Sequence, residues 1–300
     1  MSNAASDVTA SFVAVLIANP ANPVLDDALI ARTKALLPGA GAPRILNPGI
    51  AAEIGFSGAA AIEAIRTALD APLDVAIVPA SGRRKRLFLA DMDSTMIGQE
   101  CIDELADYAG MKPHVSAITE RAMRGEIAFE PALRERVLLL KGLPLSVVDE
   151  VIADRIRLTP GGTTLVRTMR ANGAYTMLVS GGFTLFTSRV AAAIGFDADR
   201  ANLLLTKGEH FAGGVAEPIL GREAKLATLV EMRGQLGLSH DDTLAVGDGA
   251  NDLAMLGEAG IGVAYHAKPQ VAAAARVRID HADLTALLYL QGYAADEFVA

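Results

Sequence analysis

The chain has 300 residues, of which 51% are apolar, and carries a formal net charge of −8 at pH 7. That length suits one large or two smaller domains, and the apolar content is ample for a buried core. The negative charge argues against a nucleic-acid-binding protein, and the single cysteine, Cys101, excludes an intrachain disulfide and is interpreted as a packing residue. No run approaches the about 18 apolar residues that a membrane span needs, and no basic segment precedes the first apolar stretch, so we expect a cytoplasmic protein.

Short strands and helices alternate over residues 1–82. Strands are predicted near 11–18, 43–47, 51–56 and 73–79, and helices at 25–37 and 59–70. This β-α-β-β-α-β order indicates a small α+β domain and resembles the ACT regulatory domain, which is often fused to amino-acid-metabolising enzymes. The loop 19–23, Asn-Pro-Ala-Asn-Pro, lacks the glycine that ligand-binding ACT domains tend to place there. We therefore favour a structural or dimerising role for this domain over amino-acid sensing.

The segment 81–86, Ser-Gly-Arg-Arg-Lys-Arg, is predicted to be a solvated linker, and a second domain is expected over 83–300. That domain opens with a buried strand, 87–90, which ends in two carboxylates, Asp91 and Asp93, followed by two hydroxyl residues. Like charges at the end of a buried strand repel each other and lose hydration, so they need a cation or a tight set of hydrogen bonds. Magnesium prefers carboxylate oxygens and recruits phosphate, so the stretch predicts phosphate chemistry. The alternative is a strand followed by an Asx-type turn, in which Asp93 and Ser94 only bond the local backbone.

Helical periodicity continues beyond residue 100, near 101–110, 113–124, 129–140 and 145–154, and predicts a helical bundle inserted at about 101–158. Strands near 174–180, 243–247, 261–264 and 277–279 then alternate with helices near 161–172, 183–194, 222–236, 251–258, 268–275 and 283–291. The alternation predicts a parallel sheet with helices on both faces, and 203–217 is expected to form a β-hairpin. An insertion directly after the first strand would sit above the carboxyl end of this sheet, where ligands of such sheets bind.

Polar residues follow two further predicted strands. Ser180-Gly181-Gly182 precedes a helix and is typical of an anion site, although it could equally be a tight turn. Asp248 follows the strand 243–247 and is placed to supply another metal carboxylate. Beyond it, Asn251 can donate a hydrogen bond to a phosphate oxygen. Asp252 could equally be the N-terminal cap of the next helix.

These motifs together resemble one family. Asp91-Met92-Asp93-Ser94-Thr95, Ser180, Lys225 and residues 247–252 match in order and spacing the four motifs of the haloacid dehalogenase-like phosphatases. With Glu100 and residues 123–125, 129–130, 133–137 and 180–183, they are most similar to the members that hydrolyse O-phospho-L-serine. The match covers about residues 85–290. It implies a Rossmann-like parallel sheet with an inserted helical cap, and magnesium-dependent hydrolysis of O-phospho-L-serine, the last step of L-serine biosynthesis.

The resemblance also implies a role for each motif residue. Asp91 would be the nucleophile that becomes an aspartyl phosphate, and Asp93 the general acid and base. Mg²⁺ would be held by Asp91, the main-chain carbonyl of Asp93, and Asp248. The phosphate would be bound by Ser180, the Gly181 amide, Lys225 and Asn251. Glu100 would face the ammonium of the substrate, Arg136 its carboxylate, and Phe129 would seal the pocket.

Two alternatives remain open at this point. One is a related phosphatase or phosphotransferase that acts on another small phosphate ester. The other is a regulatory module in which the N-terminal domain senses an amino acid. We expect a small-molecule substrate and no nucleic acid or membrane as partners, with a homodimer left open.

Overall fold

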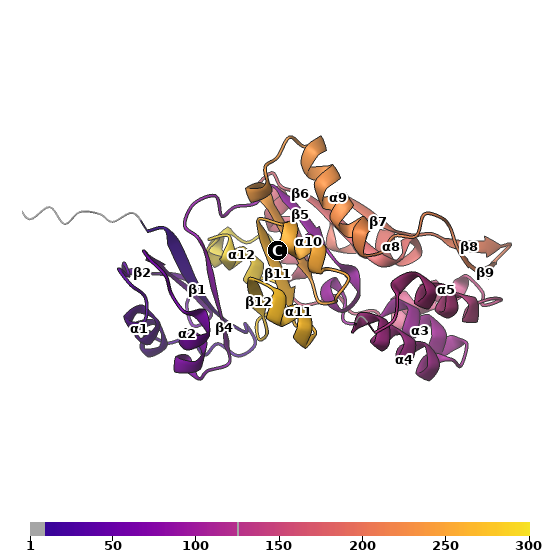
Figure 1. Ribbon diagram of the computed structural model, residues 1–300, viewed down its shortest axis with the longest axis horizontal. Coiled ribbons are helices and arrows are strands. Elements are labelled where there is room, and N and C mark those ends of the chain that lie inside the picture. Colours follow the sequence, from indigo (N-terminus) through magenta and orange to yellow (C-terminus); the bar gives the residue numbers. More distant parts are fainter. Residues whose placement is uncertain (1–9, 125) are drawn as a thin grey trace, which may run out of the picture.

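The computed structural model describes residues 10–124 and 126–300 (Figure 1). Gly125, part of the 123–125 motif, lies outside the described residues, as does the side chain of Met123. Among the described residues, none of the helices combines the length and the apolar character that crossing a membrane requires. An N-terminal domain, a central sheet and a helical insertion follow one another along the long axis of the molecule (Figure 1).

The N-terminal domain has the predicted order of elements: β1 (Phe12–Ala18), α1 (Asp27–Ala35), β2 (Pro43–Asn47), β3 (Ala51–Phe56), α2 (Ile62–Leu69) and β4 (Leu73–Pro79). Its sheet is antiparallel in the order β2-β3-β1-β4. β1 is buried on both faces. Leu16 and the other residues on the same face of β1 pack against α1 and α2, whereas Val15 and Ile17 face the second domain. The continuous apolar run of β1 therefore reflects its position between two layers.

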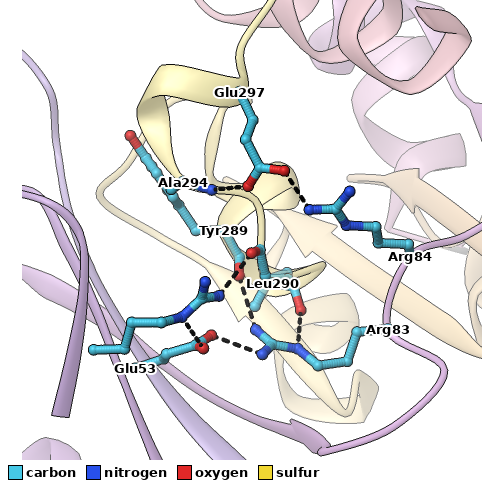
Figure 2. Close-up of polar contacts among 9 residues, drawn as sticks. Glu53, Arg83, Arg84, Tyr289, Leu290, Ala294 and Glu297 are labelled. Atoms are coloured by element: carbon cyan, nitrogen blue, oxygen red, sulfur yellow. Dashed lines mark hydrogen bonds and ion pairs between the residues drawn. The ribbon is translucent and has the colours of Figure 1, made fainter. Parts of the chain in front are cut away.

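A polar network joins the two domains (Figure 2). Glu53 of β3 accepts a hydrogen bond from Arg83 Nη1 at 2.7 Å, and Arg83 also donates to the main-chain oxygens of Tyr289 and Leu290. In a second contact, Asp74 accepts from the main-chain N–H groups of residues 280–282. The prediction of a solvated linker is thus wrong for Arg83, whose side chain is 9% exposed because its guanidinium holds the domains together, and for Lys85, which is buried with its ammonium on the main-chain oxygens of Gly82 and Asp241.

The second domain contains the predicted parallel sheet, in the order β12-β11-β10-β5-β6-β7. Its strands are β5 (Leu87–Ala90), β6 (Tyr175–Phe183), β7 (Ala198–Asn202), β10 (Thr243–Gly247), β11 (Ile261–Tyr265) and β12 (Val277–Ile279). One face packs against α9 (Arg222–Gln235), α10 (Leu253–Glu258) and α11 (Pro269–Ala274). The other packs against α7 (Gly162–Ala171), α8 (Thr184–Ile194) and α12 (Ala286–Leu290). The prediction of a Rossmann-like sheet with helices on both faces is confirmed.

Two details of this sheet differ from the prediction. β7 is an additional edge strand whose sequence, Ala-Asp-Arg-Ala-Asn, lacks the β-branched residues typical of strands. β6 continues through Ser180-Gly181-Gly182 to Phe183, and α8 begins only at Thr184. The glycine pair is therefore extended backbone rather than the first turn of a helix.

Between β5 and α7 the chain forms the four helices of the insertion: α3 (Cys101–Tyr108), α4 (Lys112–Met123), α5 (Phe129–Leu139) and α6 (Ser146–Asp154). The predicted hairpin, β8 (Leu204–Lys207) and β9 (His210–Val215), extends from the core to this cap (Figure 1). Main-chain hydrogen bonds join Phe211 of the hairpin to Gly142 and Leu143 of the cap at 2.9 and 3.0 Å. The cap is thus connected to the core by the hairpin as well as by its own two chain segments.

Candidate active site

The neighbouring strands β10, β5 and β6 bring three of the predicted motifs to one edge of the sheet. Because the strands are parallel, Asp91 and Asp248, which directly follow β5 and β10, and Ser180, which lies in the last part of β6, gather at the same edge of the sheet. A cavity of about 250 Å³ opens there, between the sheet and the cap. Eight of the predicted site residues line it: Asp91, Asp93, Glu100, Phe129, Arg136, Ser180, Gly181 and Asn251. The other two, Lys225 and Asp248, lie directly behind them.

The turn after β5, η1 (Met92–Met96), places the first carboxylates. The Asp91 carboxylate accepts a hydrogen bond from the Met92 N–H at 2.8 Å. Ser94 has a φ of +56°, a left-handed conformation that is unfavourable for a residue with a side chain and is concentrated at functional sites. Its hydroxyl donates to the Glu100 carboxylate at 2.7 Å. The turn therefore directs both Asp91 and Glu100 toward the cavity.

Lys225 lies between two carboxylates and is 1% exposed. Its Nζ is 2.6 Å from Asp91 Oδ1 and 2.7 Å from Asp252 Oδ1. Burial opposes the charge of Lys225, but the two carboxylates outweigh burial and raise its pKa. Burial and the charge of Asp252 raise the pKa of Asp91 well above its ordinary range, and Lys225 opposes them. The lysine ammonium thus holds the Asp91 carboxylate in a fixed position at the floor of the cavity.

Asp252 was not among the predicted site residues. As the residue before α10 it makes no side-chain cap hydrogen bond to that helix; its carboxylate instead accepts from Lys225 Nζ and from the Gly249 N–H at 3.1 Å. Its position in the same short segment as Asp248, between β10 and α10, was the available signal, since polar residues directly after a parallel strand lie at the edge where ligands bind.

Three buried carboxylates form a cluster that fits a divalent cation. Oxygens of Asp91, Asp248 and Asp252 all lie within 4.8 Å of one another. Burial and the charge of Asp252 raise the pKa of Asp248 to about 7, so the cluster is strained by its own negative charge. Asn251 Oδ1 is buried and has no hydrogen-bond partner among the described residues, which leaves it available to a ligand or to water on a metal. An all-oxygen donor set of this kind suits a hard cation.

Asp93 lies outside this cluster and has a different environment. Its carboxylate accepts from the main-chain N–H of Cys101 at 3.3 Å, and the Cys101 side chain is buried as predicted. Burial raises the pKa of Asp93 to about 6. A methyl group on Gly182 would lie 3.0 Å from Asp93 Oδ2 and from Ser180 Oγ. Glycine therefore gives the Asp93 carboxylate room beside β6. A carboxyl group with a pKa of about 6 is suited to proton transfer near neutral pH.

The cap supplies the opposite wall of the cavity. Arg136 of α5 is 5% exposed; its Nε donates to the Ala132 main-chain oxygen and its Nη1 to Thr119 Oγ1 at 2.8 Å. Phe129 lies over Gly181 of β6, since a Cβ on that glycine would be 3.0 Å from the Phe129 ring. Burial, and then the charge of Asp93, raise the pKa of Glu100. The cavity lining thus contains a carboxyl group, Glu100, and a guanidinium, Arg136, together with Asp91 and Asp93.

Comparison with known proteins identifies relatives of this chain. Residues 88–257 match the family model described as haloacid dehalogenase-like hydrolase. The chain is 48% identical over 210 residues to a phosphoserine phosphatase from a Polaromonas species. The aligned region covers 68% of this chain and 89% of the relative.

Two solved structures are also similar. A haloacid dehalogenase family hydrolase from Salmonella enterica serovar Typhi has a TM-score of 0.82 and 28% identity, covering 95% of this chain and 99% of its own. A structure described as a phospho-aspartyl intermediate analogue of phosphoserine phosphatase has a TM-score of 0.65 and 38% identity. It covers 69% of this chain and 98% of its own.

Proposed function

The chain belongs to the haloacid dehalogenase-like hydrolases, and we propose that it hydrolyses O-phospho-L-serine to L-serine and inorganic phosphate, the reaction that ends L-serine biosynthesis. The observation that carries this proposal is the pairing of Glu100 and Arg136 in one cavity with Asp91 and Asp93. Every phosphate monoester presents the same reacting group, so the substrate is selected by what surrounds that group. A carboxylate and a guanidinium together complement the ammonium and carboxylate of an amino acid.

Asp91 is the nucleophile in this proposal. Its carboxylate attacks phosphorus and the ester oxygen leaves, so that an aspartyl phosphate forms and a difficult hydrolysis becomes two easier steps. Lys225 holds the attacking carboxylate at 2.6 Å and stabilises negative charge beside it. Ser180 Oγ and the Gly181 amide bind the phosphoryl oxygens from the β6 side, and Asn251 from the β10 side.

Asp93 transfers the protons. In its acid form it protonates the departing serine oxygen, and as the carboxylate it then removes a proton from the water that hydrolyses the aspartyl phosphate. A pKa of about 6 supports both roles, because neither form is strongly disfavoured near neutral pH. Burial beneath the cap, with Phe129 over Gly181, limits the access of other water.

We propose Mg²⁺ as the cation of this site, held by the Asp91 carboxylate, the main-chain carbonyl of Asp93, and Asp248. Its charge would offset the repulsion between the Asp91 carboxylate and the phosphate dianion. The raised pKa values of Asp91 and Asp248 and the unpartnered Asn251 Oδ1 support a cation here.

We infer a structural role for the ACT-like N-terminal domain. Asn19, in the loop where ACT domains bind ligands, donates instead to the main-chain oxygen of His281 at 2.8 Å. The test is calorimetric titration of serine and glycine onto the whole protein while a phosphate analogue fills the catalytic cavity. We expect no binding outside that cavity. Binding at a site in the N-terminal domain would revive the sensing role.

A substrate panel tests the proposed reaction. We expect Mg²⁺-dependent phosphate release from O-phospho-L-serine, with a kcat/KM well above that for phosphothreonine, a sugar phosphate and an aryl phosphate. Asp91→Asn should abolish release from all four, since the amide is not a nucleophile. Hydrolysis of the aryl phosphate without hydrolysis of phosphoserine would retain the catalytic assignment and overturn the substrate.

A further inference from the structure

Arg136 uses only part of its hydrogen-bonding capacity within the protein. A guanidinium carries five N–H donors. Arg136 donates from Nε to Ala132 and from Nη1 to Thr119, and it makes no ion pair with a carboxylate among the residues that the structure describes. Since Arg136 also lines the cavity, its remaining donors and its full charge are available to a ligand.

Thr119 of α4 is the side chain that orients this guanidinium. It is 4% exposed and lines the same cavity. Its hydroxyl accepts from Arg136 and therefore has one hydrogen left to donate, with two acceptors in reach: Asp103 Oδ1 at 2.8 Å and the Val115 main-chain oxygen at 3.0 Å. The Asp103 carboxylate is the stronger acceptor because it is charged.

Asp103 of α3 is itself fixed in place. Its second oxygen accepts from Ser116 Oγ at 2.6 Å. Donors therefore run in one direction, from Arg136 through Thr119 to Asp103, and such chains polarise each member and strengthen the next bond. Three cap helices, α3, α4 and α5, meet in this network.

The threonine is chemically better suited than an acid at this position. A carboxylate in direct contact with Arg136 would occupy the guanidinium fork and neutralise the charge that the ligand needs. A hydroxyl between Asp103 and Arg136 uses a single N–H and transmits orientation without neutralising the guanidinium.

We propose that Thr119, held by Asp103, is a positioning residue that sets the Arg136 fork and thereby selects phosphate esters that carry a carboxylate. This inference rests on the proposed function, in which Arg136 binds the carboxylate of the substrate. Thr119 touches no reacting atom, so its contribution belongs to substrate recognition and not to phosphoryl transfer.

The test compares Thr119→Val, which keeps the shape but lacks the hydroxyl, with Thr119→Ser, which keeps the hydroxyl. Steady-state kinetics are measured on O-phospho-L-serine and on O-phosphoethanolamine, the same ester without a carboxylate. We expect Thr119→Val to raise KM for phosphoserine about tenfold, the value of one well-formed hydrogen bond to a charged group, with little change in kcat. Its kinetics on phosphoethanolamine should stay within about twofold of wild type, and Thr119→Ser should restore the wild-type KM.

Asp103→Asn should raise KM for phosphoserine in the same selective way and supplies the test if Thr119→Val does not fold. An equal loss on both esters, or an unchanged KM for phosphoserine, would overturn the inference. If the wild type itself does not prefer phosphoserine to phosphoethanolamine, the proposed substrate fails. If the wild type prefers phosphoserine and Thr119→Val and Asp103→Asn keep that preference, the proposed substrate stands and only the positioning role of Thr119 is refuted.

Discussion

Replacing Asp252 with asparagine tests the arrangement behind the nucleophile. The change removes one negative charge and keeps the side-chain volume. Asp252 now accepts from Lys225 Nζ at 2.7 Å and from the Gly249 N–H at 3.1 Å. Asparagine has one acceptor oxygen, so it can serve the lysine or the amide but not both. If that oxygen stays with the Gly249 N–H, Lys225 is held by Asp91 alone, and if it turns to Lys225, the contact loses the charge of the carboxylate.

The magnitude follows from those contacts. The Lys225 contact is a hydrogen bond between two charged groups, worth about 1.5–3 kcal/mol, which corresponds to a loss of roughly 10- to 150-fold in kcat/KM if Lys225 is no longer held in place. The pKa of Asp91 should fall, because the charge of Asp252 is the largest factor after burial that raises it. The loss should therefore come from misplaced Lys225 and not from a protonated nucleophile.

The assay is kcat/KM for O-phospho-L-serine over a range of pH, beside thermal unfolding. Asp241→Asn is the matched control, because the Asp241 side chain is 88% exposed and, among the described residues, its one polar contact is with its neighbour His240. We expect the control to match wild type and Asp252→Asn to lose at least tenfold at every pH. A kcat/KM within twofold of wild type would refute the argument that Asp252 positions Lys225.

Three further predictions follow from the structure. Mg²⁺ affinity should fall about tenfold or more from pH 8 to pH 6, because a protonated carboxyl must lose its proton to bind metal. Burial and the charge of Asp252 raise the pKa of Asp248 to about 7, within this range. Equal Mg²⁺ affinities at the two pH values, measured by calorimetry, would contradict this prediction. Asp74→Ala leaves three main-chain N–H groups without their acceptor, so urea unfolding should show a loss of about 2–4 kcal/mol, whereas the exposed Asp296→Ala should show none. Gly181→Ala places a methyl 3.0 Å from the Phe129 ring and should raise KM; adding Phe129→Leu should recover part of that loss, and no recovery would mean that the clash is elsewhere.

Local sequence patterns predicted the sheet, and together with the family resemblance they predicted most of the candidate residues that line the cavity. Strand and helix periods differ, so alternating elements with polar residues at the strand ends could be placed without coordinates. The carboxyl ends of β5, β6 and β10 meet because parallel strands share an edge, which brought Asp91, Ser180 and Asp248 together as expected.

Features that depend on packing were missed. β7 has a polar sequence and becomes a strand only by pairing with β6. Asp252 had the alternative of capping a helix, and only the position of Lys225 shows which group its carboxylate serves. The network of Arg136, Thr119 and Asp103 joins three helices, so it depends on how they pack and not on spacing within any one of them.

The central claim, that Asp91 takes the phosphoryl group from O-phospho-L-serine, is tested most directly by trapping the phosphorylated enzyme. Substrate labelled with ³²P is mixed with excess enzyme and Mg²⁺, quenched in acid within milliseconds, and the labelled peptide is sequenced. We predict a hydroxylamine-sensitive label on Asp91, absent in Asp91→Asn and present when Asp241→Asn is used. Label on another residue, or phosphate release without any labelled protein at the earliest times, would contradict the account.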